Sequence, residues 1–446
     1  MSPAPNDAPR LRRALKLRDL VVYGIILIQP TAPLPIFGVI AEKAHGHVVT
    51  TILLAMVAML FTAMSYGQMA RAYPSAGSAY SYVGREINPL LGQLTGWMMT
   101  LDYLMNPIIS VIFCSVSARN LVPEIPFPVW ACFFAVLFTW FNSRGIKTSA
   151  RMNQILITIM SAVIVIFMIA AFRYLFGSAA PQVSLVKPFF DPATFSLPLV
   201  ASGASIAALT YIGFDGVSTL SEEVENPRRN IMLATVLTCL VTGLLASAQV
   251  YVGQLVWPDF TSFPNVETAF SYIAGRVGGD WLFYVFNGTL LLASLGSGMG
   301  AQLGAARLLY AMGRENVLPK GFFGVIDAKR QLPLNNVLTV GVIALAGAFL
   351  MDFALGCELL NFGAFVAFMG VNLAAFLNGF VRAEKRIWWK AVCPLAGILF
   401  CGYLWLSLGT FAKVAGLAWV LGGLVLFAVR RYLLGIPVTP FVETEA

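Results

Sequence analysis

Runs of about 20 apolar residues recur along this chain, separated by short polar segments. A helix of that length crosses the hydrocarbon core of a bilayer, so the pattern predicts an all-α membrane protein with about twelve spans. Short amphipathic helices are expected before the third and fifth spans, at 77–87 and 145–150. The spans are predicted at residues 20–42, 48–70, 90–118, 127–142, 150–172, 197–222, 230–256, 281–311, 335–352, 358–380, 389–408 and 413–432.

The first apolar run is interrupted at its centre by prolines and polar residues. Residues 23–37 read YGIILIQPTAPLPIF. Proline removes a backbone donor and breaks the helical hydrogen-bond ladder. Non-helical backbone at this depth is tolerated only where protein or a watery cavity surrounds it. We therefore predict that the helix opens here and presents free N–H and C=O groups to a solute; a simple proline kink is the structural alternative.

The sixth run carries a second interruption. Residues 205–225 read SIAALTYIGFDGVSTLSEEVE, in which Gly213 and Gly216 flank Asp215. Glycine costs about 1 kcal/mol against alanine in a helix interior, and aspartate costs about 2.5–3.5 kcal/mol at the centre of a membrane helix. Spans one and six are five apart. Interrupted helices at matching places in two inverted halves indicate the binding site of a secondary transporter.

The composition supports a membrane protein with no soluble domain of its own. Of 446 residues, 58% are hydrophobic and only 11% are charged, whereas soluble domains carry about 25% charged residues. The polar, basic N-terminal segment leads directly into the first span, so we expect no cleavable signal peptide.

The net charge of +8 is explained by membrane topology and not by a nucleic-acid partner. The predicted spans place most of the 29 Lys and Arg residues on one side of the membrane, which is therefore expected to be cytoplasmic, with both termini there. We expect the cytoplasmic (inner) membrane as the location, with lipids as neighbours. Six basic residues fall on the other side: Lys43, Arg119, Arg173, Lys187, Arg276 and Lys413.

No metal site, cofactor or catalytic centre is predicted. The six cysteines are scattered without metal-ligand spacing, and a free thiol inside a span behaves as a small apolar group. His45 and His47 form a close pair in an external loop, which offers too few ligands for a metal. The sequence shows no nucleophile–base arrangement, so we do not expect an enzyme.

Three stretches resemble the amino acid–polyamine–organocation (APC) superfamily of transporters, and the resemblance covers nearly the whole chain. They are YIGFDGVSTLSEEVENPRRN (211–230), FTAMSYGQMARAYPSAGSAYSYVGREINPLLGQLTGWMMTLDYL (61–104) and GAARLLYAMGRENVLP (304–319). The resemblance implies a LeuT-like fold with two inverted five-helix repeats and secondary transport by alternating access. The chain would then divide into a tail (1–18), a first repeat (19–190), a second repeat (191–382), two further helices (383–433) and a second tail (434–446).

Within the superfamily, the sequence is most similar to bacterial putrescine importers. The patterns LRRALKLRDL, GHV, LFTAMSYG, GWMMTLDYL and LLNFGAF carry this narrower resemblance. This sequence departs from the family pattern at a position that bears on ion coupling. Met160 lies near the place where several amino acid-transporting relatives carry a lysine. A mechanism taken from those relatives is therefore in doubt.

Asp215 and Asp102 are the only acidic residues that the pattern places well inside the bilayer. As a carboxylate, Asp215 could pair with a substrate ammonium; as an acid, it could carry a coupling proton. Two acids in one cavity would suit a dication. Capping of the helix break is the alternative role for Asp215, and pairing with another helix is the alternative for Asp102.

The break in span one bears on the class of substrate. Amino acid transporters of the superfamily usually bind the α-carboxylate on the free N–H groups of a glycine-rich loop. Here Pro33 and Pro35 have no N–H group, which favours a solute without a carboxylate. This preference for a solute without a carboxylate is weak, because other residues of this loop still carry backbone N–H donors. Substrate contacts are expected from Gln29, Thr31, Ala32, Leu34, Asn106, Tyr211, Gly213, Phe214, Gly216, Phe362 and Phe365, besides the two aspartates.

Glu222, Glu223 and Arg228 are predicted to form a salt-bridged cytoplasmic gate, with a solvated loop as the alternative. The leading hypothesis is an importer of a small, putrescine-like amine, coupled to protons. The alternatives are an amino acid permease, coupled to protons or sodium, and a solute sensor with the transporter fold. An intramembrane enzyme and a channel are disfavoured.

Overall fold

The computed structural model describes residues 15–73, 78–145, 150–177, 184–220, 224–314, 318–433 and 435. Within these residues the chain is helical and contains no strand beyond two isolated bridges, which confirms the all-α prediction. The α-helices are α1 (Leu17–Ile28), α2 (Phe37–Lys43), α3 (Val48–Ala72), α4 (Ser78–Glu86), α5 (Pro89–Leu121), α6 (Phe127–Ser143), α7 (Ala150–Phe176), α8 (Leu197–Ala207), α9 (Pro227–Val256), α10 (Ala269–Gly278), α11 (Asp280–Arg314), α12 (Lys320–Phe323), α13 (Leu334–Leu350), α14 (Phe353–Phe376), α15 (Trp389–Leu406) and α16 (Thr410–Ala428).

Short turns of other helix types complete these spans. The 3₁₀ helices η1 (Ala208–Tyr211) and η2 (Phe214–Leu220) continue α8. The π-helical turns η3 (Leu377–Val381) and η4 (Val429–Leu433) extend α14 and α16.

The described helices agree with the predicted twelve spans. Eight are long and apolar enough to cross a membrane: α3, α5, α7, α8 with its 3₁₀ continuation, α9, α11, α14 and α16. The helices α6, α13 and α15 are shorter but equally apolar. The remaining span is the broken pair α1 and α2.

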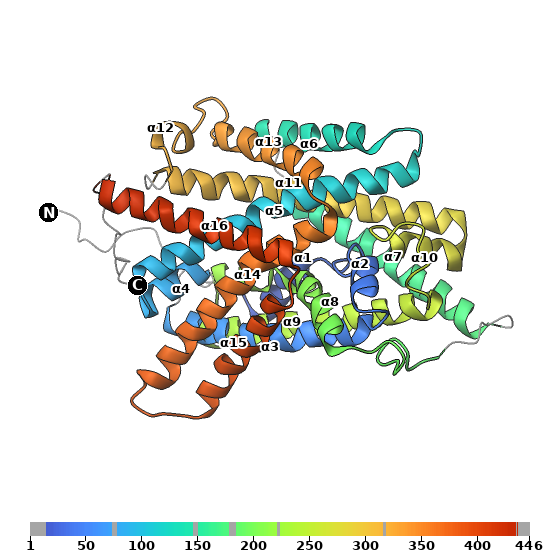
Figure 1. Cartoon of the computed structure of the whole chain (residues 1–446), viewed down its shortest axis with the longest axis horizontal. Helices are drawn as coiled ribbons and strands as arrows, with labels where there is room; N and C mark the ends of the chain where they lie inside the picture. Colours follow the sequence, from blue (N-terminus) through green and yellow to red (C-terminus); the bar gives the residue numbers. More distant parts are fainter. Residues whose placement is uncertain are drawn as a thin grey trace.

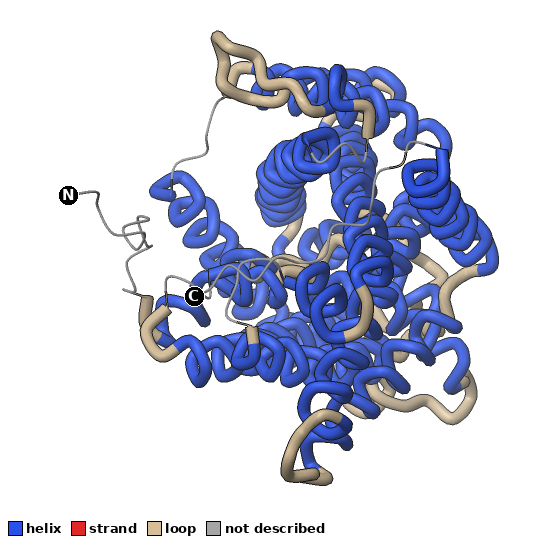
Figure 2. Tube along the Cα trace, turned by 90° about the vertical axis from the view of Figure 1, so that its left-hand side faces the viewer, coloured by secondary structure: helices blue, strands red, loops and turns tan. Residues whose placement is uncertain are grey.

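The long helices run side by side along the longest axis of the molecule (Figure 1), and several are seen end-on in the perpendicular view (Figure 2). The helix α5 is central, because 72% of its most apolar stretch is buried inside the protein. The helices α7 and α16 are peripheral, because only 22% of the corresponding stretch is buried in each. Spans two and seven pack together as α3 and α9, and spans three and eight as α5 and α11. Each pair is five spans apart, which is the arrangement that the predicted repeats 19–190 and 191–382 would give.

Two short helices lie outside the prediction. They are α10 and α12, in the loops before and after α11. Both are too short to cross a bilayer, so a search for long apolar runs cannot find them. The amphipathic helix predicted at 77–87 is present as α4, whereas residues 146–149 of the one predicted at 145–150 lie outside the described part.

Candidate substrate site at the broken helices

The first span is broken between α1, which ends at Ile28, and α2, which begins at Phe37. Gln29 leaves the helix with φ 69°. The Ala32 N–H group donates to the Gln29 carbonyl (3.2 Å), and the Leu34 N–H group donates to the Thr31 carbonyl (3.0 Å). The predicted break is confirmed, but it folds into turns that use two of its own donors.

A side chain from span seven satisfies an exposed carbonyl at this break. Gln249 on α9 donates from Nε2 to the Pro30 carbonyl at 3.1 Å and is only 4% exposed. A carbonyl freed from a helix inside a membrane needs such a partner. Gln249 therefore stabilises the break, a role that one amide in an apolar run does not reveal.

The sixth span is also broken as predicted. After η1 the chain becomes extended at Ile212 (φ −61°, ψ 128°), and Gly213 has φ 120° before η2 begins. Residues with a side chain rarely adopt that φ, so glycine is required there. Asn361 on α14 donates from Nδ2 to the carbonyls of Ser205 (2.7 Å) and Ile206 (3.2 Å), at the end of α8.

The two breaks lie beside each other. The helix α1 packs on η2, and α2 packs on α8, so each half of span one meets the opposite half of span six. A Cβ atom at Gly213 would lie 3.4 Å from the Leu27 backbone, and one at Gly216 would lie 2.7 Å from the Leu27 side chain. The central prediction, that both helices unwind side by side, is therefore confirmed.

Asp215 lies at the centre of this region. Its carboxylate lies near the backbone N–H groups of Gly213 and Gly216, as the alternative capping role requires, although the Gly216 N–H group donates to the Gly213 carbonyl at 3.1 Å. Asp102 on α5 lies near enough for its negative charge to repel that of Asp215, and Tyr103 lies near both aspartates. The structure thus brings the two predicted acids together from different spans.

Two glycines let neighbouring helices approach the α5 part of the site. A Cβ atom at Gly363 on α14 would lie 2.6 Å from the Met98 carbonyl and 3.4 Å from the Asp102 nitrogen. One at Gly304 on α11 would lie 3.0 Å from the Tyr103 ring. Tyr103 remains 39% exposed, and Asp102, Asn106, Asp215 and Gly216 are partly exposed, so these groups are not sealed in the core.

We expect Gly363→Ala to displace α14 from α5 beside Asp102. The added methyl group meets backbone, which cannot move aside as a flexible side chain can, so overpacking should cost about 1–3 kcal/mol. Thermal unfolding in detergent and initial uptake rates measure the effect. The control is Gly300→Ala on α11, where a Cβ atom meets nothing within 4 Å. Equal stability of the two variants would contradict the close approach.

An aromatic cluster borders η2 and was only partly predicted. The Phe214 ring lies 5.5 Å from that of Tyr66 on α3 and 5.4 Å from that of Phe368 on α14, between centroids. Tyr82 on α4 lies 6.1 Å from Tyr66. Tyr66 and Phe368 were missed because each is an ordinary apolar position within its own span, and Tyr82 because it lies in the short amphipathic helix α4.

The other predicted aromatic residues serve packing in this structure. Tyr211 is fully buried and donates its hydroxyl to the Ile52 carbonyl at 2.9 Å. Phe362 is also fully buried, with its ring 5.3 Å from Trp405 on α15 and in contact with Gly416 on α16. Its ring therefore faces α15 and α16, so the structure gives no support for Phe362 as a pocket wall. Phe365 is fully buried too.

The predicted cytoplasmic gate falls largely outside the described part of the chain. Glu222 and Glu223 are not described, and for Arg228 only the backbone is described, within the first turn of α9. Shortly after residues 221–223, the Glu225 N–H group donates to the Leu15 carbonyl at 2.9 Å. This hydrogen bond joins the segment before α1 to the segment after span six.

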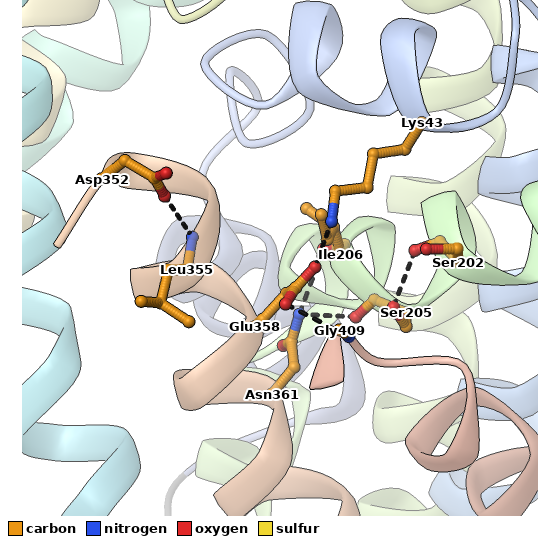
Figure 3. Close-up of polar contacts among 9 residues, drawn as sticks. All are labelled: Lys43, Ser202, Ser205, Ile206, Asp352, Leu355, Glu358, Asn361 and Gly409. Carbon is orange, nitrogen blue, oxygen red and sulfur yellow. Dashed lines mark hydrogen bonds and ion pairs between the residues drawn. The ribbon is translucent and has the colours of Figure 1, made fainter. Parts of the chain in front are cut away.

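A further buried acid was not singled out in the sequence. Glu358 is 3% exposed, because α14 begins at Phe353 and places this residue in the second helical turn. Its carboxylate forms an ion pair with Lys43, the last residue of α2, and accepts a hydrogen bond from the Gly409 N–H group at 3.2 Å (Figure 3). Half of broken span one is thereby tied to spans ten and twelve.

Glu86 is a second buried acid, at the end of α4, with 2% exposure. It accepts hydrogen bonds from the Tyr73 hydroxyl (2.6 Å), from Asn378 Nδ2 (2.5 Å) and from Arg382 (2.8 Å). The hydrophobic pattern of the sequence does not identify Glu86 as buried, because this residue lies in a short polar helix between spans. Its three partners join α3, α4 and η3.

Two cavities among the described residues lie elsewhere. One of about 320 Å³ is lined by the loop residues His45, Asp191 and Pro258, among others. The other, of about 620 Å³, lies between α3, α9 and α15. Neither is lined by Asp102 or Asp215, so the case for a substrate site rests on the paired breaks and the partial exposure of the acidic pair.

Comparisons with known proteins agree with this architecture. Residues 21–425 match the family model described as amino acid permease. The chain is 35% identical over 438 residues to the low-affinity putrescine importer PlaP of Escherichia coli, covering 95% of both chains. It is 28% identical over 402 residues to the vacuolar cationic amino acid transporter 4 of Arabidopsis thaliana, covering 85% of this chain and 65% of that protein.

A third relative is the branched-chain amino acid permease BcaP of Lactococcus lactis, 24% identical over 444 residues and covering 93% of this chain and 94% of the relative. The match extends across both broken spans and most of the helices described above. With its apolar helices and paired breaks, the chain belongs to the amino acid permease family of the APC superfamily and is a membrane transporter.

Proposed function

We propose that this transporter imports a small aliphatic diamine of the putrescine type across the cytoplasmic membrane, with protons as the coupling ion. The observation that carries the proposal is the placement of two partly exposed acids, Asp215 in η2 at the span-six break and Asp102 on α5, near enough for their negative charges to repel each other. Each end of a diammonium ion can then meet one carboxylate, which relieves the repulsion between the two acids. The similarity to a putrescine importer over 95% of the chain agrees with this substrate class.

The geometry of span one supports a substrate without a carboxylate. The Ala32 and Leu34 N–H groups already donate within the turn, and Pro33 and Pro35 have none. An amino acid carboxylate would find only the Thr31 and Ile36 N–H groups of this turn without a backbone hydrogen bond. The Asp215 carboxylate likewise lies beside the backbone N–H groups of Gly213 and Gly216, where its charge would repel a substrate carboxylate.

We propose that Asp215 and Asp102 also exchange the coupling proton. A carboxylate among membrane helices is costly as an unpaired ion, so it must be either protonated or paired with a cation. Substrate and proton are therefore linked through the same two groups. The basic side of the protein, with both termini, is assigned to the cytoplasm by the positive-inside rule.

An amino acid permease is the second candidate. It is favoured by the family description and by relatives named for branched-chain and cationic amino acids. In that case a carboxylate would bind the Thr31 and Ile36 N–H groups, which make no backbone hydrogen bond in the turn.

Uptake into proteoliposomes distinguishes the two candidates. Labelled putrescine should accumulate when the lumen is alkaline relative to the medium and should not require sodium. Competition by 1,4-diaminobutane analogues but not by alanine or leucine supports the diamine. Uptake blocked by amino acids and untouched by diamines would replace the proposal with the permease, and accumulation driven only by sodium would remove the proton.

We expect Asp102→Asn to impair diamine uptake selectively. Removing one of two carboxylates should weaken putrescine binding by about tenfold or more, while 1-butylamine, with a single ammonium, should change by less than about threefold. Apparent affinities from competition curves measure the difference. A similar loss for both amines would indicate that Asp102 serves packing between helices instead.

A further inference from the structure

The cavity of about 620 Å³ opens at the basic end of the bundle, where α3 ends and α15 begins. It is separate from the acidic pair, since neither Asp102 nor Asp215 lines it. Its volume falls in the usual range for sites that hold small organic molecules. Apolar side chains form one wall, including Met64 on α3 and Met232 and Val236 on α9.

The mouth of this cavity is positively charged. Arg71 in the last turn of α3 and Lys390 in the first turn of α15 both line it, and both are exposed. No acidic side chain is among the described lining residues. The amino-terminal turn of α15 adds a favourable dipole for an anion.

A buried hydroxyl faces this cavity without a hydrogen-bond partner. Ser65 on α3 lines the cavity, is 1% exposed, and its Oγ makes no hydrogen bond. Serine and threonine in membrane helices usually donate to the carbonyl one turn earlier, as Thr62 does to Ala58 at 3.1 Å. A buried polar atom without a partner is rare in native proteins, and a ligand oxygen in the cavity would satisfy it.

The cavity lies between surfaces that face lipid. Large apolar side chains are exposed on the same two helices, among them Leu240 and Leu244 on α9 and Val392 and Leu399 on α15. A molecule that enters from the side must therefore combine an apolar part with an anionic group. A phospholipid has this form, and basic pockets between membrane helices suit its anionic head groups.

We propose that this cavity binds one anionic phospholipid. Its phosphate lies between Arg71 and Lys390, its glycerol or ester oxygens reach Ser65, and an acyl chain lies along Met232 and Val236. A zwitterionic lipid carries a positive group in its head group, which Arg71 and Lys390 repel, so it binds more weakly. Inorganic phosphate lacks the apolar part and does not fill the cavity.

Native mass spectrometry of the full-length protein, titrated with phosphatidylglycerol or phosphatidylcholine, tests the charge. Phosphatidylglycerol should bind at least about tenfold more tightly than phosphatidylcholine. Lys390→Gln should weaken its binding about fivefold, and Arg71→Gln with Lys390→Gln about thirtyfold. The matched control, Lys329→Gln with Arg330→Gln, removes two charges that do not line the cavity. An equal loss in the control, or none in the Arg71 and Lys390 variant, overturns the proposal.

A second pair of variants tests the apolar wall without changing any charge. Val236→Trp fills the cavity and should weaken phosphatidylglycerol binding at least about tenfold, whereas Leu244→Trp on the lipid-facing side of α9 should not. Ser65→Ala should leave folding intact and weaken binding by a few-fold. Unchanged binding by Val236→Trp, or displacement of the lipid by inorganic phosphate at constant ionic strength, contradicts the proposed lipid.

Discussion

Asp215→Asn is expected to abolish uphill uptake while the protein still inserts and folds. Asparagine keeps an acceptor oxygen beside the N–H groups of Gly213 and Gly216, so a capping role at the break should be retained. It loses both the negative charge and the titrating proton. If Asp215 binds the ammonium or carries the proton, accumulation should fall by about a hundredfold or more, since interactions with charged groups contribute most at buried sites.

Two measurements separate the roles that Asp215 could have. Substrate counterflow without a proton gradient reports substrate binding and the alternating-access movement. Accumulation against the substrate gradient also needs coupling to protons. Loss of accumulation with retained counterflow assigns the proton to Asp215; loss of both assigns the substrate ammonium. Asp215→Ala is the companion variant, because it removes the cap as well and should lower thermal stability. Full accumulation by Asp215→Asn would contradict both roles and leave only the cap.

The breaks could be predicted because their signals are local. Prolines at 30, 33 and 35 cannot continue a helix, and Gly213 and Gly216 around Asp215 disfavour one within a few residues of sequence. The same is true of most spans, whose length and apolarity are set by the bilayer. The number of spans follows from this pattern, and so does the match between spans one and six.

What holds the breaks in place could not be predicted, because it depends on contacts between distant parts of the chain. Gln249 caps the Pro30 carbonyl across 219 residues of sequence, and Asn361 caps Ser205 across 156. A polar amide inside an apolar run could equally face another helix or a cavity. Only the packing of α9 and α14 against the breaks decides which carbonyl it meets.

The direction of a side chain was equally hard to predict. Phe362 and Phe365 lie on α14, which packs against span six, yet the Phe362 ring turns toward α15 and α16. Helical periodicity gives the face of a residue only when one face of the helix is clearly polar, and the few polar residues of α14, such as Glu358 and Asn361, are too sparse to mark one. Phe368, on the same helix, contacts Phe214 at the break instead.

Lys43→Met is expected to destabilise the protein more than Glu358→Gln, although both remove the same ion pair. The Glu358 side chain is 4% exposed, whereas that of Lys43 is 32% exposed. Without Lys43, a buried carboxylate keeps only the Gly409 N–H group, and an unpaired buried charge costs about 3–5 kcal/mol. Without the Glu358 charge, Lys43 can still reach water, so we expect a loss of about 1 kcal/mol.

Unfolding in mixed detergents measures this asymmetry, and Lys187→Met is the matched control. Lys187 also pairs with an acid, Asp191 at 3.1 Å, but its side chain is 62% exposed. An exposed pair contributes about 0–1 kcal/mol. Combining Lys43→Met with Glu358→Gln should restore part of the lost stability, because no buried charge then remains. Lys43 ends α2, the second half of broken span one, and Glu358 lies on α14. Loss of this ion pair should therefore also loosen α2 from α14 and slow the conformational return of the empty transporter. A Lys43→Met variant as stable as Lys187→Met would show that the pair does not anchor that half.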